Sequence, residues 1–268
     1  MKPEELKLVV QEKYGEIALQ TNNNNAASCC GSGSCCGDMD YTVFSNDYSG
    51  LEGYQPDADL GLGCGLPTEF AGIQQGDHVL DLGSGAGNDC FVARTITGAE
   101  GHVTGLDFTD AMVNKARENL AKTGFTNIRF VQGDIEQIPL PDNAFDVVIS
   151  NCVLNLVPGK EVAFKEIFRV LKPGGHFCIS DIVLQGNLPD EIREAAEMYA
   201  GCISGAIQKE EYLDIITRLG FVDVNVHIEK PIMLPDDLLQ QYIGPENISA
   251  YHSGSFGIIS ITVNASKP

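Results

Sequence analysis

The chain has 268 residues, 43% of them apolar and 20% charged, a balance that fits a globular protein and excludes global disorder. Its 17 basic and 37 acidic residues give a net charge of −20, which disfavours nucleic acids and anionic lipids as partners. No apolar run is long enough to span a bilayer, and no leader-like stretch follows Met1, so we expect a cytoplasmic protein.

The first 60 residues differ in composition from the rest of the chain. Residues 1–19 predict a short amphipathic helix, with apolar residues placed at intervals among the charges. The next stretch is rich in Asn, Gly and Ser and contains two adjacent pairs of cysteines, which are Cys29, Cys30, Cys35 and Cys36. We therefore predict that residues 1–60 form a helix followed by a flexible, cysteine-rich loop.

From residue 76 onward, predicted strands and helices alternate. The predicted strands are 78–82, 102–106, 128–132, 145–150, 177–183, 222–228 and 258–263. Helices are predicted from about 88, over 110–123 and 162–171, and around 190–205 and 209–219. This order predicts an α/β fold: a doubly wound, mostly parallel seven-stranded sheet with an antiparallel edge. Residues 61–268 would form one domain, with helical cover segments at about 186–220 and closing strands in 222–268.

A glycine-rich turn directly follows the first predicted strand. Its glycines have the spacing G-x-G-x-G over residues 83–87, and Asp81 stands two positions before the first of them. Asp107 ends the second predicted strand, where a carboxylate can accept hydrogen bonds from both hydroxyls of a ribose. Asp134 follows the third strand, within reach of an adenine amino group. Each acid alone reads as a solvated loop charge, but together they favour an adenosine pocket.

This arrangement resembles the class I S-adenosylmethionine-dependent methyltransferases, as does the turn at 171–175 before the fifth strand. The resemblance implies a Rossmann-like fold with S-adenosylmethionine as cofactor. A dehydrogenase is the rival interpretation, but its glycine spacing would be G-x-G-x-x-G. The cofactor-binding residues implied are Asp81, Gly83, Ser84, Gly85, Gly87, Asp107, Phe108, Asp134, Ile135 and Asn151.

Three cysteines occur in segments that can approach the predicted pocket. Cys152 follows the fourth strand, and alone it could be a methylated nucleophile, a packed thiol or a ligand. Cys64 lies between Gly63 and Gly65, which we expect to leave its sulfur accessible, and Cys202 is flanked by small residues. Three thiolates without a fourth fixed ligand suit a soft, trigonal-pyramidal centre better than tetrahedral zinc. Trivalent arsenic is such a centre, and its remaining lone pair is a nucleophile for a methyl group.

At these residues the chain resembles the arsenite S-adenosylmethionine methyltransferases. The matching segments are 14–18, the Cys-Cys-Gly repeats, 61–67, 81–91, 150–156, 166–175 and 200–206. The resemblance implies that Cys152 and Cys202 are the principal arsenic ligands, with Cys64 as the third. It implies methylation of arsenite and methylarsenite in arsenic detoxification, with a thiol reductant such as thioredoxin or glutathione.

The four N-terminal cysteines have two interpretations. Methylation raises arsenic formally to the pentavalent state, and a dithiol in this loop could return two electrons by forming a disulfide. A mobile metal-scavenging tail is the alternative, although adjacent cysteines and a C-x4-C gap depart from the C-x2-C pattern that is common in zinc sites. Two further functions also stay open: a methyltransferase acting on carbon or oxygen of a small metabolite, and a non-enzymatic thiol sensor.

Overall fold

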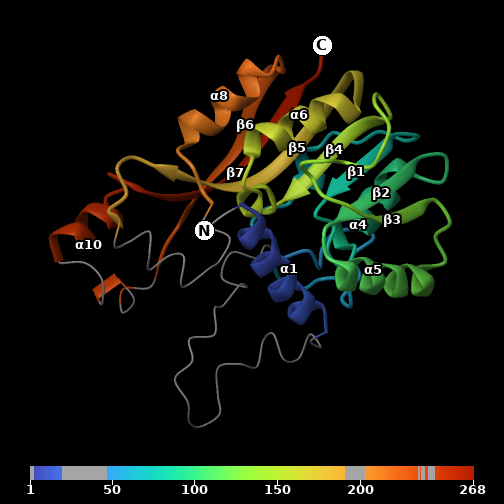
Figure 1. The fold of residues 1–268 in the computed structure, drawn as a ribbon, viewed down its shortest axis with the longest axis horizontal. Coiled ribbons are helices and arrows are strands. Elements are labelled where there is room, and N and C mark those ends of the chain that lie inside the picture. The colour runs from blue at the N-terminus through green and yellow to red at the C-terminus, as the bar shows by residue number, and fades with distance from the viewer. Residues whose placement is uncertain are drawn as a thin grey trace, which may run out of the picture.

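The computed structural model describes residues 3–19, 47–190, 203, 205–234, 236, 239–240 and 245–268. Seven strands in these residues form one sheet in the order β3-β2-β1-β4-β5-β7-β6 (Figure 1). Their bounds are β1 His78–Leu82, β2 His102–Asp107, β3 Ile128–Gln132, β4 Phe145–Asn151, β5 Leu171–Gln185, β6 Val222–Ile232 and β7 Gly257–Ser266. β1 to β5 are parallel, and β7 runs antiparallel between β5 and β6. The predicted mostly parallel sheet with an antiparallel edge is confirmed.

Helices cover both faces of this sheet. Their bounds are α1 Pro3–Leu19, α3 Pro67–Phe70, α4 Asn88–Thr97, α5 Asp110–Thr123, α6 Lys160–Val170, α8 Lys209–Arg218 and α10 Pro245–His252. One hydrophobic cluster joins the sheet to α4, α5 and α1 through Phe91, Met112 and Ile17. The opposite cluster joins it to α6 and α8 through Phe164 and Tyr212. β1 and β2 are buried at every residue after the first, as expected for parallel strands that are covered on both faces. None of the helices in the described part of the chain is long and apolar enough to cross a membrane.

The fifth strand begins earlier than its sequence pattern predicts. A turn over 171–175 was expected before a strand at 177–183, but β5 already starts at Leu171. The extension has a physical cause at the C-terminal end of the chain. The Gly174 N–H donates to the carbonyl of Lys267 at 2.9 Å, and the Lys267 N–H donates to the Gly175 carbonyl at 2.8 Å. These bonds continue the β5–β7 pairing past the glycines.

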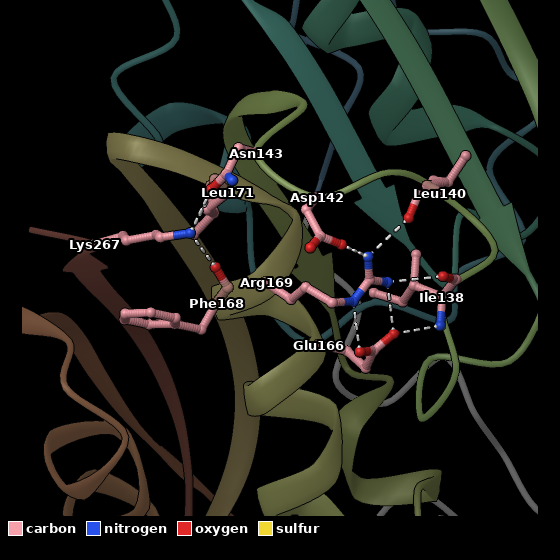
Figure 2. A network of polar contacts seen from close by, with 9 residues as sticks. All are labelled: Ile138, Leu140, Asp142, Asn143, Glu166, Phe168, Arg169, Leu171 and Lys267. Atoms are coloured by element: carbon pink, nitrogen blue, oxygen red, sulfur yellow. Dashed lines mark hydrogen bonds and ion pairs between the residues drawn. The ribbon is translucent and has the colours of Figure 1, made fainter.

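Arg169 fixes the connection between β3 and β4. Its guanidinium, on α6, donates to the carbonyls of Ile138 and Leu140 at 2.8 and 2.9 Å (Figure 2). Glu166, one turn earlier, pairs with Arg169 and accepts from the Ile138 N–H at 2.7 Å. Burial by itself would favour the neutral carboxyl, but the Arg169 hydrogen bonds outweigh it and lower the pKa of Glu166. The segment that follows Asp134 is therefore held against α6.

Candidate active site

The glycine-rich turn leaves β1 at the carboxyl edge of the sheet. Gly83, Gly85 and Gly87 have φ angles of 71°, 50° and 99°, in the left-handed region that glycine adopts without strain. The N–H groups of Gly83 and Ser84 both donate to the Leu106 carbonyl of β2, at 2.7 and 3.0 Å. The turn is thereby bound to the neighbouring strand, and it curves around an open space before α4 begins.

That space is a pocket with an empty volume of about 1120 Å³, which includes room open to solvent. Nine of the ten predicted cofactor-binding residues line it: Asp81, Gly83, Ser84, Gly85, Asp107, Phe108, Asp134, Ile135 and Asn151. Gly87 does not line it. A Cβ on Gly87 would lie 2.8 Å from the Phe130 ring, so this glycine allows close packing behind the turn. The pocket stands beyond strand ends where the strand order reverses, the usual ligand position in such sheets.

Asp107 connects the end of β2 to the glycine turn. One carboxylate oxygen accepts from the Gly85 N–H at 2.9 Å, and the other accepts from the Thr109 N–H at 2.8 Å. Burial raises the pKa of Asp107, and these backbone hydrogen bonds oppose the rise. Each oxygen keeps a further lone pair, so the carboxylate can still accept hydrogen bonds from a ligand.

Asp81 and Asp89 give the opposite end of the pocket its acidic character. Both side chains are buried, and burial followed by the charge of Asp89 raises the pKa of Asp81 well above its ordinary range. Burial raises the pKa of Asp89 to about 6, against the effect of its hydrogen bonds from Asn151 and Tyr48. Cys90 is fully buried, and its thiol donates to Asp81 at 3.2 Å. A ligand carrying positive charge would be stabilised at this end.

Asp134 lies at the pocket edge under the N-terminal helix. The ammonium group of Lys7, on α1, pairs with Asp134 and with Glu136. The other oxygen of Asp134 accepts from the Glu136 N–H at 2.9 Å. The Lys115 ammonium on α5 donates to the Ala18 carbonyl at 3.0 Å and so binds the far end of the helix. α1 therefore forms one wall of the pocket and is fixed near both ends.

The residues present fit an S-adenosyl cofactor. The hydroxyl of Ser84 and the side-chain oxygen of Asn88 line the pocket, are buried, and have no hydrogen-bond partner among the described residues. Buried polar atoms of this kind are normally satisfied, so their position indicates a polar ligand. A Cβ on Gly85 would meet nothing within 4 Å, which leaves space beside the turn. Separate carboxylates at Asp107 and Asp81 match the ribose hydroxyls and the positively charged end of such a molecule.

Cys64 and Cys152 share one hydrophobic cluster on the pocket's far side. Cys152 lines the pocket, and Cys64 lies directly after the pocket residue Gly63. The expectation that glycines would leave Cys64 accessible is wrong, because its exposed fraction is only 3%. It is packed in a cluster that also contains residues from distant segments of the chain, such as Ile182 and Ile258. Cys152 is also buried and has a φ of 60°, a backbone conformation that is strained for a residue with a Cβ.

Five of the predicted thiols lie outside the described residues. They are Cys202 and the four N-terminal cysteines Cys29, Cys30, Cys35 and Cys36. Within the described residues, no group of three or more His, Cys, Asp or Glu side chains is placed to hold a metal ion. Of the three predicted arsenic ligands, the structure describes Cys64 and Cys152, and these two lie in the same hydrophobic cluster.

Two residues of the site were not predicted from the sequence. Tyr48 and Asp89 both line the pocket, and the Tyr48 hydroxyl donates to the Asp89 carboxylate at 3.0 Å. The signal for Asp89 was its position in the first turn of the helix after the glycine motif, facing the same pocket. Tyr48 precedes every predicted strand, so local sequence carried no signal for it.

Comparisons with known proteins agree with this geometry. A family described as "Methyltransferase domain" matches residues 73–220. An arsenite methyltransferase of Halobacterium salinarum is 37% identical over an alignment of 284 positions, which covers 99% of this chain and 68% of that protein. The human arsenite methyltransferase is 36% identical over 193 positions, covering 68% of this chain but only 50% of its own length. This chain thus spans between half and about two thirds of these relatives.

Solved structures show the same fold. An arsenic(III) S-adenosylmethionine methyltransferase from Chlamydomonas reinhardtii superposes with a TM-score of 0.64 at 34% identity, covering 75% of this chain and 66% of that one. The YcgJ protein from Bacillus subtilis has a TM-score of 0.63 at 20% identity and covers 75% of this chain and 96% of its own. The second similarity supports the fold alone. The Rossmann-like methyltransferase fold expected from the sequence is confirmed.

Proposed function

The chain belongs to the arsenite methyltransferase family, and from this premise we propose that it transfers the methyl group of S-adenosylmethionine to trivalent arsenic held by three cysteine thiolates. One observation carries the proposal. Cys152 lines the same pocket as Asp81 and Asp107, so a ligand on its sulfur would face a cofactor bound to those carboxylates. The substrate class would be arsenite and methylarsenite, delivered as thiol conjugates.

The proposed thiol site comprises Cys64, Cys152 and Cys202. The first two lie in one buried cluster that also contains Ile203. Ile203 directly follows Cys202, and successive Cα atoms are only about 3.8 Å apart. This proximity supports convergence of the third sulfur on the other two.

The proposed chemistry is an in-line displacement. When bound, S-adenosylmethionine supplies an electrophilic methyl group, with Asp107 holding the ribose, Asp134 the adenine and Asp81 the positive end. Thiolates at Cys64, Cys152 and Cys202 donate electron density to arsenic and keep its lone pair reactive. The arsenic–carbon bond would form as the carbon–sulfur bond of the sulfonium breaks, and the neutral thioether S-adenosylhomocysteine would leave. Burial of Cys64 and Cys152 excludes water from their sulfurs, which strengthens the electrostatic interactions there.

A reduction step completes the proposed cycle. Methylation leaves arsenic formally pentavalent, and two electrons from a dithiol return it to the trivalent state as a disulfide and two protons form. We assign this dithiol to the N-terminal pairs Cys29, Cys30, Cys35 and Cys36. Thioredoxin or glutathione would then reduce the disulfide, which places the enzyme in the reducing cytoplasm. The biological role would be arsenic detoxification.

Purified protein with arsenite, labelled S-adenosylmethionine and a thiol reductant tests the proposal. We expect labelled methylated arsenicals, and at least a hundredfold loss of product in Cys152→Ser and Cys202→Ser. Cys178→Ser is the matched control, because this fully buried cysteine belongs to a different hydrophobic cluster from Cys64 and Cys152 and does not line the pocket. Cofactor binding without any methylated arsenical would overturn the arsenic assignment and favour a carbon or oxygen acceptor. Absence of cofactor binding would favour the thiol sensor.

A further inference from the structure

The amide of Asn151 holds the backbone on both sides of the Cys64 thiol. Its Oδ1 accepts a hydrogen bond from the Cys64 N–H at 3.0 Å. Its Nδ2 donates to the Gly65 carbonyl at 2.9 Å and to the Tyr48 hydroxyl at 2.6 Å. Both amide hydrogens are used within the protein, so the Asn151 amide orients the Cys64 loop. From β7, Ser260 donates to the Cys64 carbonyl at 2.7 Å and holds the loop from the other side.

The same amide reaches the acidic end of the cofactor pocket. Tyr48 accepts from Asn151 and donates to Asp89, and Asn151 Nδ2 also stands 3.3 Å from an Asp89 oxygen. Tyr48 and Asp89 are 4% and 9% exposed, so these bonds are shielded from water. All three residues line the pocket. A continuous set of hydrogen bonds therefore runs from the pocket wall to the backbone of a proposed arsenic ligand.

We propose that Asn151, Tyr48 and Asp89 couple the two sites, so that the cofactor and a trivalent arsenical each strengthen the binding of the other. This inference rests on the proposed function and adds positioning residues to it. A cationic cofactor beside Asp89 favours its ionised form, and an ionised carboxylate accepts hydrogen bonds about twice as strongly as a neutral group. Tyr48 and Asn151 are then held more firmly, and the Cys64 N–H with them. By linkage, the coupling acts equally in both directions.

Calorimetric titration measures this coupling without turnover. Arsenite is titrated into the full chain, with a non-thiol reductant present, in the absence and presence of saturating sinefungin, a cofactor analogue that keeps a positive charge and has no transferable methyl group. We expect sinefungin to tighten arsenite binding at least fivefold in the wild type, within the usual range of coupling between sites. In Tyr48→Phe and in Asn151→Ala we expect sinefungin at saturating concentration to tighten arsenite binding less than twofold, and this ratio compares two states of the same variant, so a change in the variant's own sinefungin affinity does not alter it.

Two matched controls separate coupling from general loss of structure. Tyr251→Phe removes another buried hydroxyl, which donates to the Ile232 carbonyl at 2.5 Å and does not line the pocket. Asn127→Ala removes an amide that donates to the Gly98 and Gly101 carbonyls, at the opposite edge of the sheet. Both controls should keep the wild-type ratio.

The outcomes distinguish this inference from the function on which it rests. If both ligands bind the wild type but sinefungin does not change its affinity for arsenite, the coupling is wrong and the proposed function still stands. If sinefungin tightens arsenite binding in Tyr48→Phe and Asn151→Ala as much as in the wild type, these two residues do not couple the sites. Failure of the wild type to bind arsenite under any condition overturns the proposed function, and the coupling with it.

Discussion

Lys7 and Asp134 are 127 positions apart in the chain, yet the Lys7 ammonium lies 2.5 Å from a carboxylate oxygen of Asp134. The contact joins α1 to the segment that follows β3, at the edge of the cofactor pocket. Because Glu136 pairs with the same ammonium, one lysine holds two acidic side chains of that segment. An acid interpreted from the sequence as a ligand for adenine therefore also anchors a wall of the pocket.

We predict that Lys7→Met weakens cofactor binding two- to fivefold, because α1 loses its attachment at the pocket edge. Partly exposed ion pairs contribute only about 0.2–1 kcal/mol, so a larger effect is not expected. As the salt concentration rises from 50 to 500 mM, the cofactor affinity of the wild type should fall more steeply than that of the variant. Titration calorimetry at both salt concentrations measures this difference.

Lys122→Met is the control for that experiment. Lys122 pairs with Asp57 at 2.7 Å on the exposed surface and does not line the pocket. Its loss should leave cofactor affinity unchanged at both salt concentrations. Equal salt dependence in wild type and Lys7→Met would contradict a role for Lys7 at the pocket.

Asp107→Ala should weaken cofactor binding at least tenfold while the protein stays folded. The variant loses hydrogen bonds to the ribose, each about 1.5–3 kcal/mol when charge-assisted, and frees the Gly85 N–H of the turn. Calorimetry gives the affinity, and circular dichroism confirms the fold. The exposed Asp110, three positions later, provides the control Asp110→Ala. Unchanged affinity in a folded Asp107→Ala would remove Asp107 from the site.

Asp181 should make stability depend on pH. Burial raises its pKa to about 7, against the opposing effects of the Lys160 charge, the Ile182 N–H and the Tyr212 hydroxyl. Glu211 also acts on Lys160 from α8. Between about pH 4 and 7 the folded state then binds more protons at Asp181 than the unfolded state does, so this group's contribution to stability falls as pH rises.

Asp181→Asn removes that titration. The urea midpoint of the variant minus that of the wild type should increase from pH 4 to pH 7 and stay constant above pH 7.5. Exchange of the neutral carboxyl for an amide shifts the whole difference curve by a constant amount without changing this slope. A difference that is constant across the range would show that Asp181 does not titrate there.

Replacing Cys29, Cys30, Cys35 and Cys36 together with serine should slow turnover on arsenite while cofactor affinity stays unchanged. The reason is loss of the dithiol proposed to return two electrons to arsenic. Added thioredoxin should not restore the rate, because its target disulfide can no longer form. Full activity of this variant with thioredoxin present would show that the electrons come from Cys64, Cys152 or Cys202.

The sheet and the glycine turn were predictable because their signals are local. Periodicity marked the strands, and the rule that ligands bind beyond the carboxyl ends of parallel strands brought Asp81, Asp107 and Asp134 to one pocket. Tyr48 was not predictable, because its contact with Asp89, 41 positions later, depends on tertiary packing. The glycines beside Cys64 indicated freedom of the local backbone, but they carried no information about the distant residues that bury this thiol.

The left-handed backbone of Cys152 bears on attempts to stabilise this enzyme. A residue with a Cβ costs about 1–2 kcal/mol in this conformation, whereas glycine adopts it freely. Selection of variants for heat resistance alone would therefore favour glycine at position 152 and discard the thiol. Directed evolution of this scaffold would need a selection for arsenic turnover in every round, since stability and the proposed role of the thiol make opposite demands on this position.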